Sequence, residues 1–377
     1  MFDIVERYED RIEAAKERLA RTWRGQNVDR PAFVLSDVNY WITGVADEPD
    51  DYYEPAAMFA YQAAKIERHM AEIADDYIPV FHPWYGTAVL PSALGVGVRF
   101  QKGMDPAAEA PVIETPADAG KLELPDPEKD GLLPSVLAAI DYFRANTDAP
   151  VCATDTQGPL NIALTLVGTD RLFLWMYDDP PAVHQVMDFC TDALIRWVGV
   201  QKQHAGQPRD GGAYPHAIFL PPGFGGVAFS DDDLSQISAD HYREFVVPYN
   251  ARLLEAFDGG TLHFCGSARH QLTNLAALDA CTGVNNFMMG DLEQAQLLRG
   301  PFAGRGAIMA CDFNEADIPA HCESLKHLAE DPAGLVVGVF ITPAMALSNG
   351  RYDASTRTRD EIVDQYLDGL ACWLNRR

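Results

Sequence analysis

A histidine and a cysteine lie two residues apart in the stretch His263-Phe264-Cys265-Gly266, at the end of a run of strand-forming residues. Side chains alternate along a strand, so we expect His263 and Cys265 to point to the same face. An imidazole and a thiolate together are a ligand pair that suits zinc. Two ligands do not complete a metal site, and the alternative is a buried cysteine beside a hydrogen-bonded histidine.

Short runs of β-branched and aromatic residues alternate along the chain with long helical patterns. This alternation predicts a parallel sheet, and eight such units favour a closed (β/α)8 TIM barrel that forms a single α/β domain over residues 1–377. An open doubly wound sheet is the alternative, but no G-x-G-x-x-G motif follows the first predicted strand. The predicted strands are Ala32–Ser36, Tyr77–Phe81, Val151–Thr154, Gly226–Ser230, Thr261–Phe264, Val284–Met288, Gly306–Ala310 and Leu335–Phe340.

The carboxyl ends of the strands carry the chemistry in a barrel of this kind, which selects candidates without any further information. Of the seven cysteines, only Cys265 and Cys311 end predicted strands, whereas Cys281 precedes a strand and is expected at the opposite face. Asp231 is the first residue of Asp231-Asp232-Asp233, and we expect it to point into the barrel mouth while the other two cap the next helix or face solvent.

Further side chains at the same rim are expected to position a substrate. The histidines His82 and His216 are candidate acid–base groups, although a lone histidine is often simply hydrogen-bonded. The predicted substrate-binding residues are Asn39, Trp41, Trp84, Tyr85, Gln157 and His216.

The net charge of the chain is −26, from 55 acidic and 29 basic residues spread along the sequence. A field this negative repels phosphate backbones and anionic lipids, so neither nucleic acid nor a membrane is an expected partner. The charged N-terminal segment predicts an amphipathic helix and not a secretion signal. Together with the dispersed cysteines, which indicate reduced thiols, this predicts a cytoplasmic protein.

Two stretches are rich in loop-forming residues. Residues 103–135 are predicted to form a surface excursion between the second and third units. Residues 205–225 combine glycine and proline with aromatic residues such as Tyr214 and Phe224, and a loop this long is usually functional. We expect it to be a lid over the barrel mouth; the alternative is a surface loop that packs its own aromatic side chains.

The order and spacing of several stretches resemble the uroporphyrinogen decarboxylase superfamily over roughly residues 10–370. His263-Phe264-Cys265-Gly266 falls where the methyltransferase branch, which includes the methylcobalamin:coenzyme M methyltransferases, carries a zinc motif. The other matching stretches are Trp23-Arg24-Gly25-Gln26-Asn27-Val28-Asp29-Arg30-Pro31, Gly158-Pro159-Leu160, Val167-Gly168-Thr169-Asp170, Trp175-Met176-Tyr177-Asp178-Asp179-Pro180, Phe229-Ser230-Asp231-Asp232 and Tyr242-Arg243-Glu244-Phe245-Val246-Val247-Pro248-Tyr249.

The resemblance implies a (β/α)8 barrel, a zinc ion, a corrinoid on a partner protein and a homodimer. It also implies a further zinc cysteine near the last strand, but the matching segment Val337-Gly338-Val339-Phe340 has none. We expect Cys311 to take its place beside His263 and Cys265, which leaves one coordination position open, as in catalytic zinc sites. True uroporphyrinogen decarboxylases bind their substrate with arginines near the first strand. That segment here contains Asp37 and no arginine, so porphyrinogen decarboxylation is not expected.

The leading hypothesis is therefore a zinc-dependent methyltransferase acting between a small thiol or methylated compound and a corrinoid. Asp231, His263 and Cys265 are its predicted catalytic residues, and the aromatic Trp41, Trp84 and Phe224 suit a methylated or apolar substrate. One alternative is a metal-free decarboxylase or lyase that acts on a small acid through Asp231, helped by His82 or His216. Another is a ligand-binding barrel without catalysis.

Overall fold

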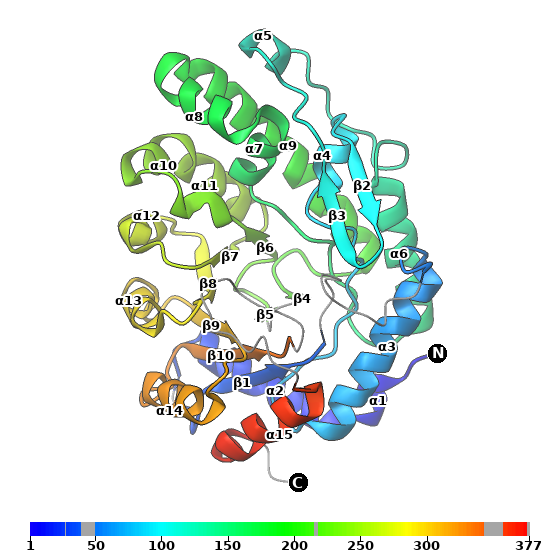
Figure 1. Cartoon of the computed structure of the whole chain (residues 1–377), viewed down its shortest axis with the longest axis vertical. Coiled ribbons are helices and arrows are strands. Elements are labelled where there is room, and N and C mark those ends of the chain that lie inside the picture. Colours follow the sequence, from blue (N-terminus) through cyan, green and yellow to red (C-terminus); the bar gives the residue numbers. More distant parts are fainter. Residues whose placement is uncertain (27, 39–49, 215–217, 343–356, 375–377) are drawn as a thin grey trace.

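Six parallel strands form the centre of the molecule, in the order β1-β10-β9-β8-β7-β6 (Figure 1). The structure is a computed structural model and describes residues 1–26, 28–38, 50–214, 218–342 and 357–374. The strands of this sheet are β1 (Ala32–Ser36), β6 (Val227–Ser230), β7 (Gly260–Cys265), β8 (Cys281–Phe287), β9 (Ala307–Phe313) and β10 (Leu335–Phe340).

Two chain segments occupy the space between β1 and β6. Phe81 forms a parallel bridge with Val151, and Gln157 forms another with Ser230 at the end of β6. On the other side, the Asp76 amide donates a hydrogen bond to the Phe33 carbonyl of β1. The predicted (β/α)8 TIM barrel is thus confirmed, although the ladder is not continuous here. Six of the eight predicted strands are strands, while the second and third contribute these isolated bridges.

Helices surround the strands on the outside of the ring (Figure 1). Those that come before β6 are α1 (Ile4–Arg7), α2 (Glu9–Trp23), α3 (Pro55–Glu72), α4 (Val89–Ala93), α5 (Pro116–Ala119), α6 (Leu133–Asn146), α7 (Pro159–Val167), α8 (Thr169–Asp178) and α9 (Pro180–Ala205). Those that follow are α10 (Ala239–Phe245), α11 (Val247–Ala256), α12 (Leu272–Ala276), α13 (Leu292–Phe302), α14 (Ile318–Leu328) and α15 (Arg359–Gly369), with short 3-10 turns η1 (Asp232–Ser235), η2 (Arg269–Gln271) and η3 (Ala371–Trp373).

The longest of these, α9, shows how local sequence sets an element. The Asp179 side chain accepts a hydrogen bond from the Ala182 amide at its start, and Pro180 fits the first turn. The helix ends at Gly206, whose φ of 65° is left-handed and suits glycine. Cys190 lies fully buried on its apolar face, as its helical spacing predicts.

The two faces of the sheet belong to different apolar clusters. Cys311 on β9 and Phe340 on β10 pack in the larger cluster, which includes the interior of the barrel. Their neighbours Ala310 and Val339 pack in a second cluster against α14 and α15. Alternate residues of each strand therefore point inward and outward, and this alternation decides which side chains reach the barrel interior.

The stretch predicted as a lid lies at the opposite end of the barrel, so that prediction is wrong. Residues 205–225 contain the antiparallel hairpin β4 (Gly212–Tyr214) and β5 (Ile218–Leu220). The Tyr214 hydroxyl donates to the Gly226 carbonyl, just before β6, and Thr282 at the start of β8 donates to the Phe224 carbonyl. A segment that connects a helix to the next strand must lie at the amino ends of the strands, which is the physical reason.

The segment that does extend from the carboxyl ends follows the second barrel position. It includes the hairpin β2 (Val98–Gln101) and β3 (Met104–Ala108), drawn in cyan in Figure 1. Asp105 on β3 accepts a hydrogen bond of 2.7 Å from the Trp84 indole. The predicted excursion of residues 103–135 thus begins inside this hairpin and runs through α5.

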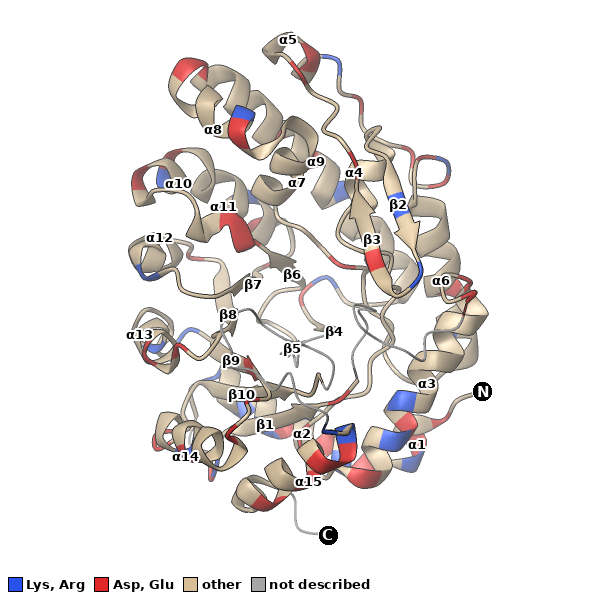
Figure 2. Cartoon of the chain, viewed as in Figure 1, with Lys and Arg blue, Asp and Glu red and all other residues tan. Residues whose placement is uncertain are grey.

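Acidic residues are distributed over the helices around the whole ring, with no concentration in one element (Figure 2). This distribution agrees with the spread of acidic residues along the sequence. Among the described residues, no helix has both the length and the apolar character that crossing a bilayer requires.

Candidate functional site

Three side chains with metal-binding atoms meet where β7 ends. The ligand atoms of Asp232, His263 and Cys265 all lie within 4.8 Å of one another. The His263 Nε2 is 3.6 Å from the Cys265 Sγ and 3.7 Å from the Asp232 Oδ1. His263 and Cys265 are two residues apart on β7, so their side chains point to the same face. Asp232 is the first residue of η1, which follows β6. The imidazole and the thiol therefore share a face, as predicted.

The ring of His263 is oriented by its neighbour on β8. Its Nδ1 lies 2.5 Å from the Oδ1 of Asn285, and the Asn285 Nδ2 donates to the Cys311 Sγ at 3.3 Å. Because the amide oxygen accepts, the hydrogen bond places the imidazole proton on Nδ1 and leaves the lone pair of Nε2 facing Asp232 and Cys265. This is the orientation that a metal ligand needs.

The Cys265 residue is solvent-exposed at the strand end, while His263 is buried. The Asp232 Oδ1 accepts a hydrogen bond of 2.7 Å from the Cys265 amide, which fixes the carboxylate beside the thiol. The protein packed around the thiol and the charge of Asp232 raise the pKa of Cys265 above its usual value. In the absence of a cation this residue is therefore a neutral thiol at pH 7.

Cys311, the predicted third zinc ligand, is not part of this group. Among the described residues, the potential ligands gathered around His263 are Asp232 and Cys265. Cys311 on β9 is fully buried and accepts a hydrogen bond from Asn285, and burial raises the pKa of its thiol to about 12. The structure therefore places the carboxylate of Asp232, and not the thiol of Cys311, beside His263 and Cys265.

The carboxylate predicted to face the mouth is also a different one. The Oδ2 of Asp231 accepts hydrogen bonds from the Tyr242 hydroxyl at 2.5 Å and the Asn250 amide at 2.8 Å, on α10 and α11. Its side chain is thus directed toward the outer helices, and the prediction for Asp231 is corrected in favour of Asp232. Burial raises the pKa of Asp231 to about 6.

Val339 lies in the segment where the resemblance implies a further zinc cysteine. Val339 is fully buried in the outer cluster, between β10 and the helices α14 and α15. A cysteine placed there would point away from His263, because strand side chains alternate. The inward neighbour, Gly338, lies against Cys311 instead.

Asp155 is a rim residue that the sequence analysis did not select. It follows the third barrel segment, and the Gln157 amide donates to its Oδ2 at 2.6 Å. Burial, reinforced by the charges of Asp232 and Asp105, raises the pKa of Asp155 to about 7. Its position directly after the third predicted strand could have identified it. Asp232 similarly lies two residues after the fourth predicted strand. The predicted Gln157 is thus tied to Asp155 by this hydrogen bond.

The remaining predicted rim residues have structural partners. His82 is buried, its Nδ1 lies 3.0 Å from the Ala153 carbonyl, and burial lowers its pKa to about 3, which makes it a poor proton carrier at neutral pH. Trp84 is held by Asp105, and the Tyr85 hydroxyl donates to the Tyr53 carbonyl at 3.0 Å. Asn39, Trp41 and His216 lie outside the described residues.

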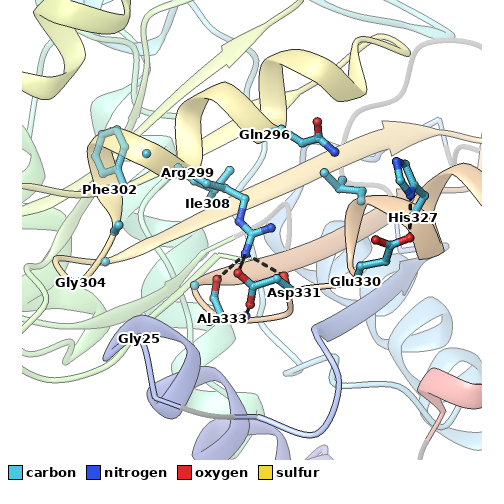
Figure 3. A pocket seen from close by; sticks show the side chains of 15 residues that line it. Gly25, Gln296, Arg299, Phe302, Gly304, Ile308, His327, Glu330, Asp331 and Ala333 are labelled. Atoms are coloured by element: carbon cyan, nitrogen blue, oxygen red, sulfur yellow. Dashed lines mark hydrogen bonds and ion pairs between the residues drawn. The ribbon is translucent and has the colours of Figure 1, made fainter.

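Two cavities lie at the amino ends of the strands, away from this cluster. One of about 540 Å³ is lined by residues of α13, α14 and the turns before β9 and β10 (Figure 3). Its Arg299 is paired with the Asp331 carboxylate at 3.0 Å and donates to the Ala333 carbonyl at 3.0 Å. The other, of about 680 Å³, lies beside the β4–β5 hairpin. Neither contains the chemistry of the His263 cluster.

Two curated proteins are similar in sequence to part of this chain. A methylated-thiol–coenzyme M methyltransferase from Methanosarcina mazei is 28% identical over 227 residues, which are 59% of this chain and 54% of that protein. A uroporphyrinogen decarboxylase from Vibrio cholerae is 29% identical over 164 residues, 42% of each chain. The matches thus span about half the length of these curated relatives.

A solved structure of a methyltransferase from Methanosarcina mazei matches 93% of this chain and 99% of its own, with a TM-score of 0.65 and 19% identity. At that identity the likeness shows the fold alone. The family model of uroporphyrinogen decarboxylase (URO-D) matches residues 14–207, just over half of the chain. The chain therefore belongs to the uroporphyrinogen decarboxylase family.

Proposed function

We propose that this protein is a zinc-dependent methyltransferase that moves a methyl group between a small thiol or methylated compound and a corrinoid carried by another protein. The observation that carries the proposal is the convergence of Asp232, His263 and Cys265 at the barrel rim. The name of the Methanosarcina mazei relative, which acts on a methylated thiol and coenzyme M, supports the same class of reaction.

The three side chains fit a zinc ion. Typical bond lengths of about 2.0 Å to nitrogen and 2.3 Å to sulfur in a tetrahedral site separate those two atoms by roughly 3.5 Å. The His263 Nε2 and Cys265 Sγ are 3.6 Å apart. One nitrogen, one sulfur and one oxygen would hold the ion and leave a fourth position for substrate. Asn285 supplies the outer hydrogen bond that such a histidine requires.

When bound, the zinc ion would supply Lewis acidity that stabilises a substrate thiol as its thiolate. The chain's own residues supply the rest. The pKa of Asp155, raised to about 7 by burial, allows this carboxylate to take up the thiol proton and release it again near neutral pH. Trp84, held by Asp105, contributes an apolar wall suited to a methyl group.

A corrinoid protein as the partner, a homodimer and a cytoplasmic setting for the free cysteines complete the proposal. The corrinoid is what the resemblance of the motif His263-Phe264-Cys265-Gly266 to the methyltransferase branch implies. The thiol of Cys265 must remain reduced for the site to work, which is the physical reason for a reducing compartment.

Metal analysis of four variants tests the site. Purified from zinc-replete medium, the wild type should carry one zinc ion per chain more than a protein whose rim site is disabled. His263→Ala, Cys265→Ala and Asp232→Ala should lose it, whereas Cys311→Ala, which removes a buried cysteine outside the group, should retain it. A wild type without metal would overturn the zinc proposal. Loss of zinc from Cys311→Ala with retention in Asp232→Ala would show that the ligand assignment is wrong while zinc binding stands.

The raised pKa of Asp155 also favours a second candidate, a metal-free decarboxylase or lyase that acts on a small acid. That reaction would be abolished in Asp155→Asn and survive in Cys265→Ala. A methyltransferase would lose turnover of a methylated thiol with cobalamin in both variants. Binding of a methylated ligand without turnover of any donor would instead indicate a barrel without catalysis.

A further inference from the structure

A second group of potential ligands lies on the outer side of the sheet, where β9 meets α14. The carboxylates of Asp312 and Glu315 and a ring nitrogen of His321 lie within 4.8 Å of one another. Asp312 is the strand neighbour of Cys311, so it points away from the barrel interior and from the His263 cluster. This outer cluster is therefore separate from the rim site.

The backbone and Tyr366 hold the outer cluster in place. The Asp312 Oδ2 accepts a hydrogen bond of 3.0 Å from the Gly290 amide, in the turn after β8. The Tyr366 hydroxyl, from α15, lies 2.7 Å from the Nδ1 of His321 and accepts a hydrogen bond from the Glu315 amide at 3.1 Å. The group thus joins β9, α14 and α15 through side chains that are already oriented.

The other ring nitrogen of His321 has no hydrogen-bond partner among the described residues. His321 is only 3% exposed, so this nitrogen lies away from bulk solvent. The Asp312 Oδ2 lies 3.8 Å away, beyond hydrogen-bond distance. A buried polar atom without a partner destabilises the folded protein, and such atoms are rare in native proteins. The orphaned Nε2 faces two carboxylate groups, an arrangement that a cation between them would satisfy.

We propose that Asp312, Glu315 and His321 bind a divalent metal ion that fastens α14 and α15 to the end of β9. One imidazole nitrogen with two carboxylates suits Mn²⁺, Fe²⁺ or Zn²⁺, with water completing the coordination. The Nδ1 of His321 faces the Tyr366 hydroxyl, so Nε2 is the ring nitrogen left for a metal ion. The site is independent of the proposed methyl transfer and has a structural role.

The test uses the full chain with the rim site disabled by His263→Gln and Cys265→Ser. This background protein, stripped with a chelator, is titrated with Mn²⁺ and with Zn²⁺, and bound metal is counted after gel filtration. We expect about one ion per chain in the background. Adding Glu315→Gln, at a half-buried and isosteric position, should weaken binding at least about tenfold, the lower end of what losing even an outer partner costs. His321→Gln should do the same.

Glu323→Gln is the matched control, because Glu323 is an exposed carboxylate on α14 paired with Lys326 and outside the cluster. It should bind metal like the background. A second readout is amide exchange in α15, which metal should slow in the background and not in Glu315→Gln. The proposal is overturned if the background binds neither ion, or if Glu315→Gln binds as tightly as Glu323→Gln. Since the rim site is absent throughout, neither result bears on the methyltransferase proposal.

Discussion

The imidazole of His263 and the amide of Asn285 face each other at paired positions of β7 and β8, with Nδ1 and Oδ1 2.5 Å apart. The register of two adjacent strands thus sets the tautomer of the histidine, and the tautomer sets which nitrogen faces the rim. Asn285 is not itself a proposed ligand, yet the zinc proposal depends on its oxygen.

Replacing Asn285 should weaken metal binding without removing a ligand. Asn285→Ala frees the imidazole to rotate and to change tautomer, so zinc affinity should fall about 10- to 100-fold. Asn285→Asp retains an acceptor oxygen at the same place and should retain most of the affinity. Competition with a chromogenic chelator measures both. Equal losses in the two variants would show that Asn285 acts through packing and not through its oxygen.

The barrel and the shared face of His263 and Cys265 could be predicted because strand period and strand count are local properties of the sequence. The choice between Asp231 and Asp232 could not. β6 ends at Ser230, and in the turn that follows, the alternation of side chains no longer applies. Val339 points outward because every second side chain of β10 does so. Which alternate set points outward depends on the strand register, which only the folded sheet supplies.

Asp231 should matter for stability and not for the metal. Asp231→Ala leaves the Tyr242 hydroxyl and the Asn250 amide buried without their acceptor, a loss of roughly 1–3 kcal/mol in the free energy of unfolding for each donor left unpaired. Asp231→Asn retains an acceptor oxygen. Burial raises the pKa of Asp231 to about 6, so the charge that the wild-type carboxylate carries at pH 8 destabilises the folded protein. The neutral amide of Asp231→Asn avoids that cost.

The measurement for Asp231 is urea denaturation at pH 8 together with zinc content. Asp231→Asn should be at least as stable as the wild type, and both variants should retain the metal. Loss of zinc from folded Asp231→Asn would show that Asp231 belongs to the metal site.

A buried charge network near the first strand should make stability depend on pH. The His69 Nδ1 lies 2.6 Å from Asp37 and its Nε2 lies 3.1 Å from Asp75. Burial alone would lower the pKa of His69, but the charges of Asp75 and Asp37 outweigh it and raise the pKa to about 9. The histidine is thus charged in the folded protein at pH 7 and neutral in the unfolded chain, whose pKa is near 6.5.

Because the folded pKa is the higher one, the stabilisation from His69 is complete below about pH 6.5 and is lost as pH rises through about 9. The urea midpoint of the wild type should therefore fall between pH 6.5 and pH 9.5. His69→Gln should be less stable at pH 6.5 and show a smaller fall. His327→Gln, at an exposed histidine paired with Glu330, is the control and should follow the wild-type profile. Parallel profiles for wild type and His69→Gln would contradict the network's role.

Gly338 and Cys311 pair across β10 and β9, and the packing between them should be measurable as a coupling energy. A Cβ at Gly338 would lie 2.8 Å from the Cys311 Sγ, so Gly338→Ala forces the sulfur to move inside a packed barrel. We expect a loss of roughly 1–3 kcal/mol in unfolding free energy. Cys311→Ala removes the sulfur and should relieve that clash, so the double variant should be more stable than the two single losses predict. Additive losses in a four-protein denaturation cycle would mean that the sulfur is not the obstacle.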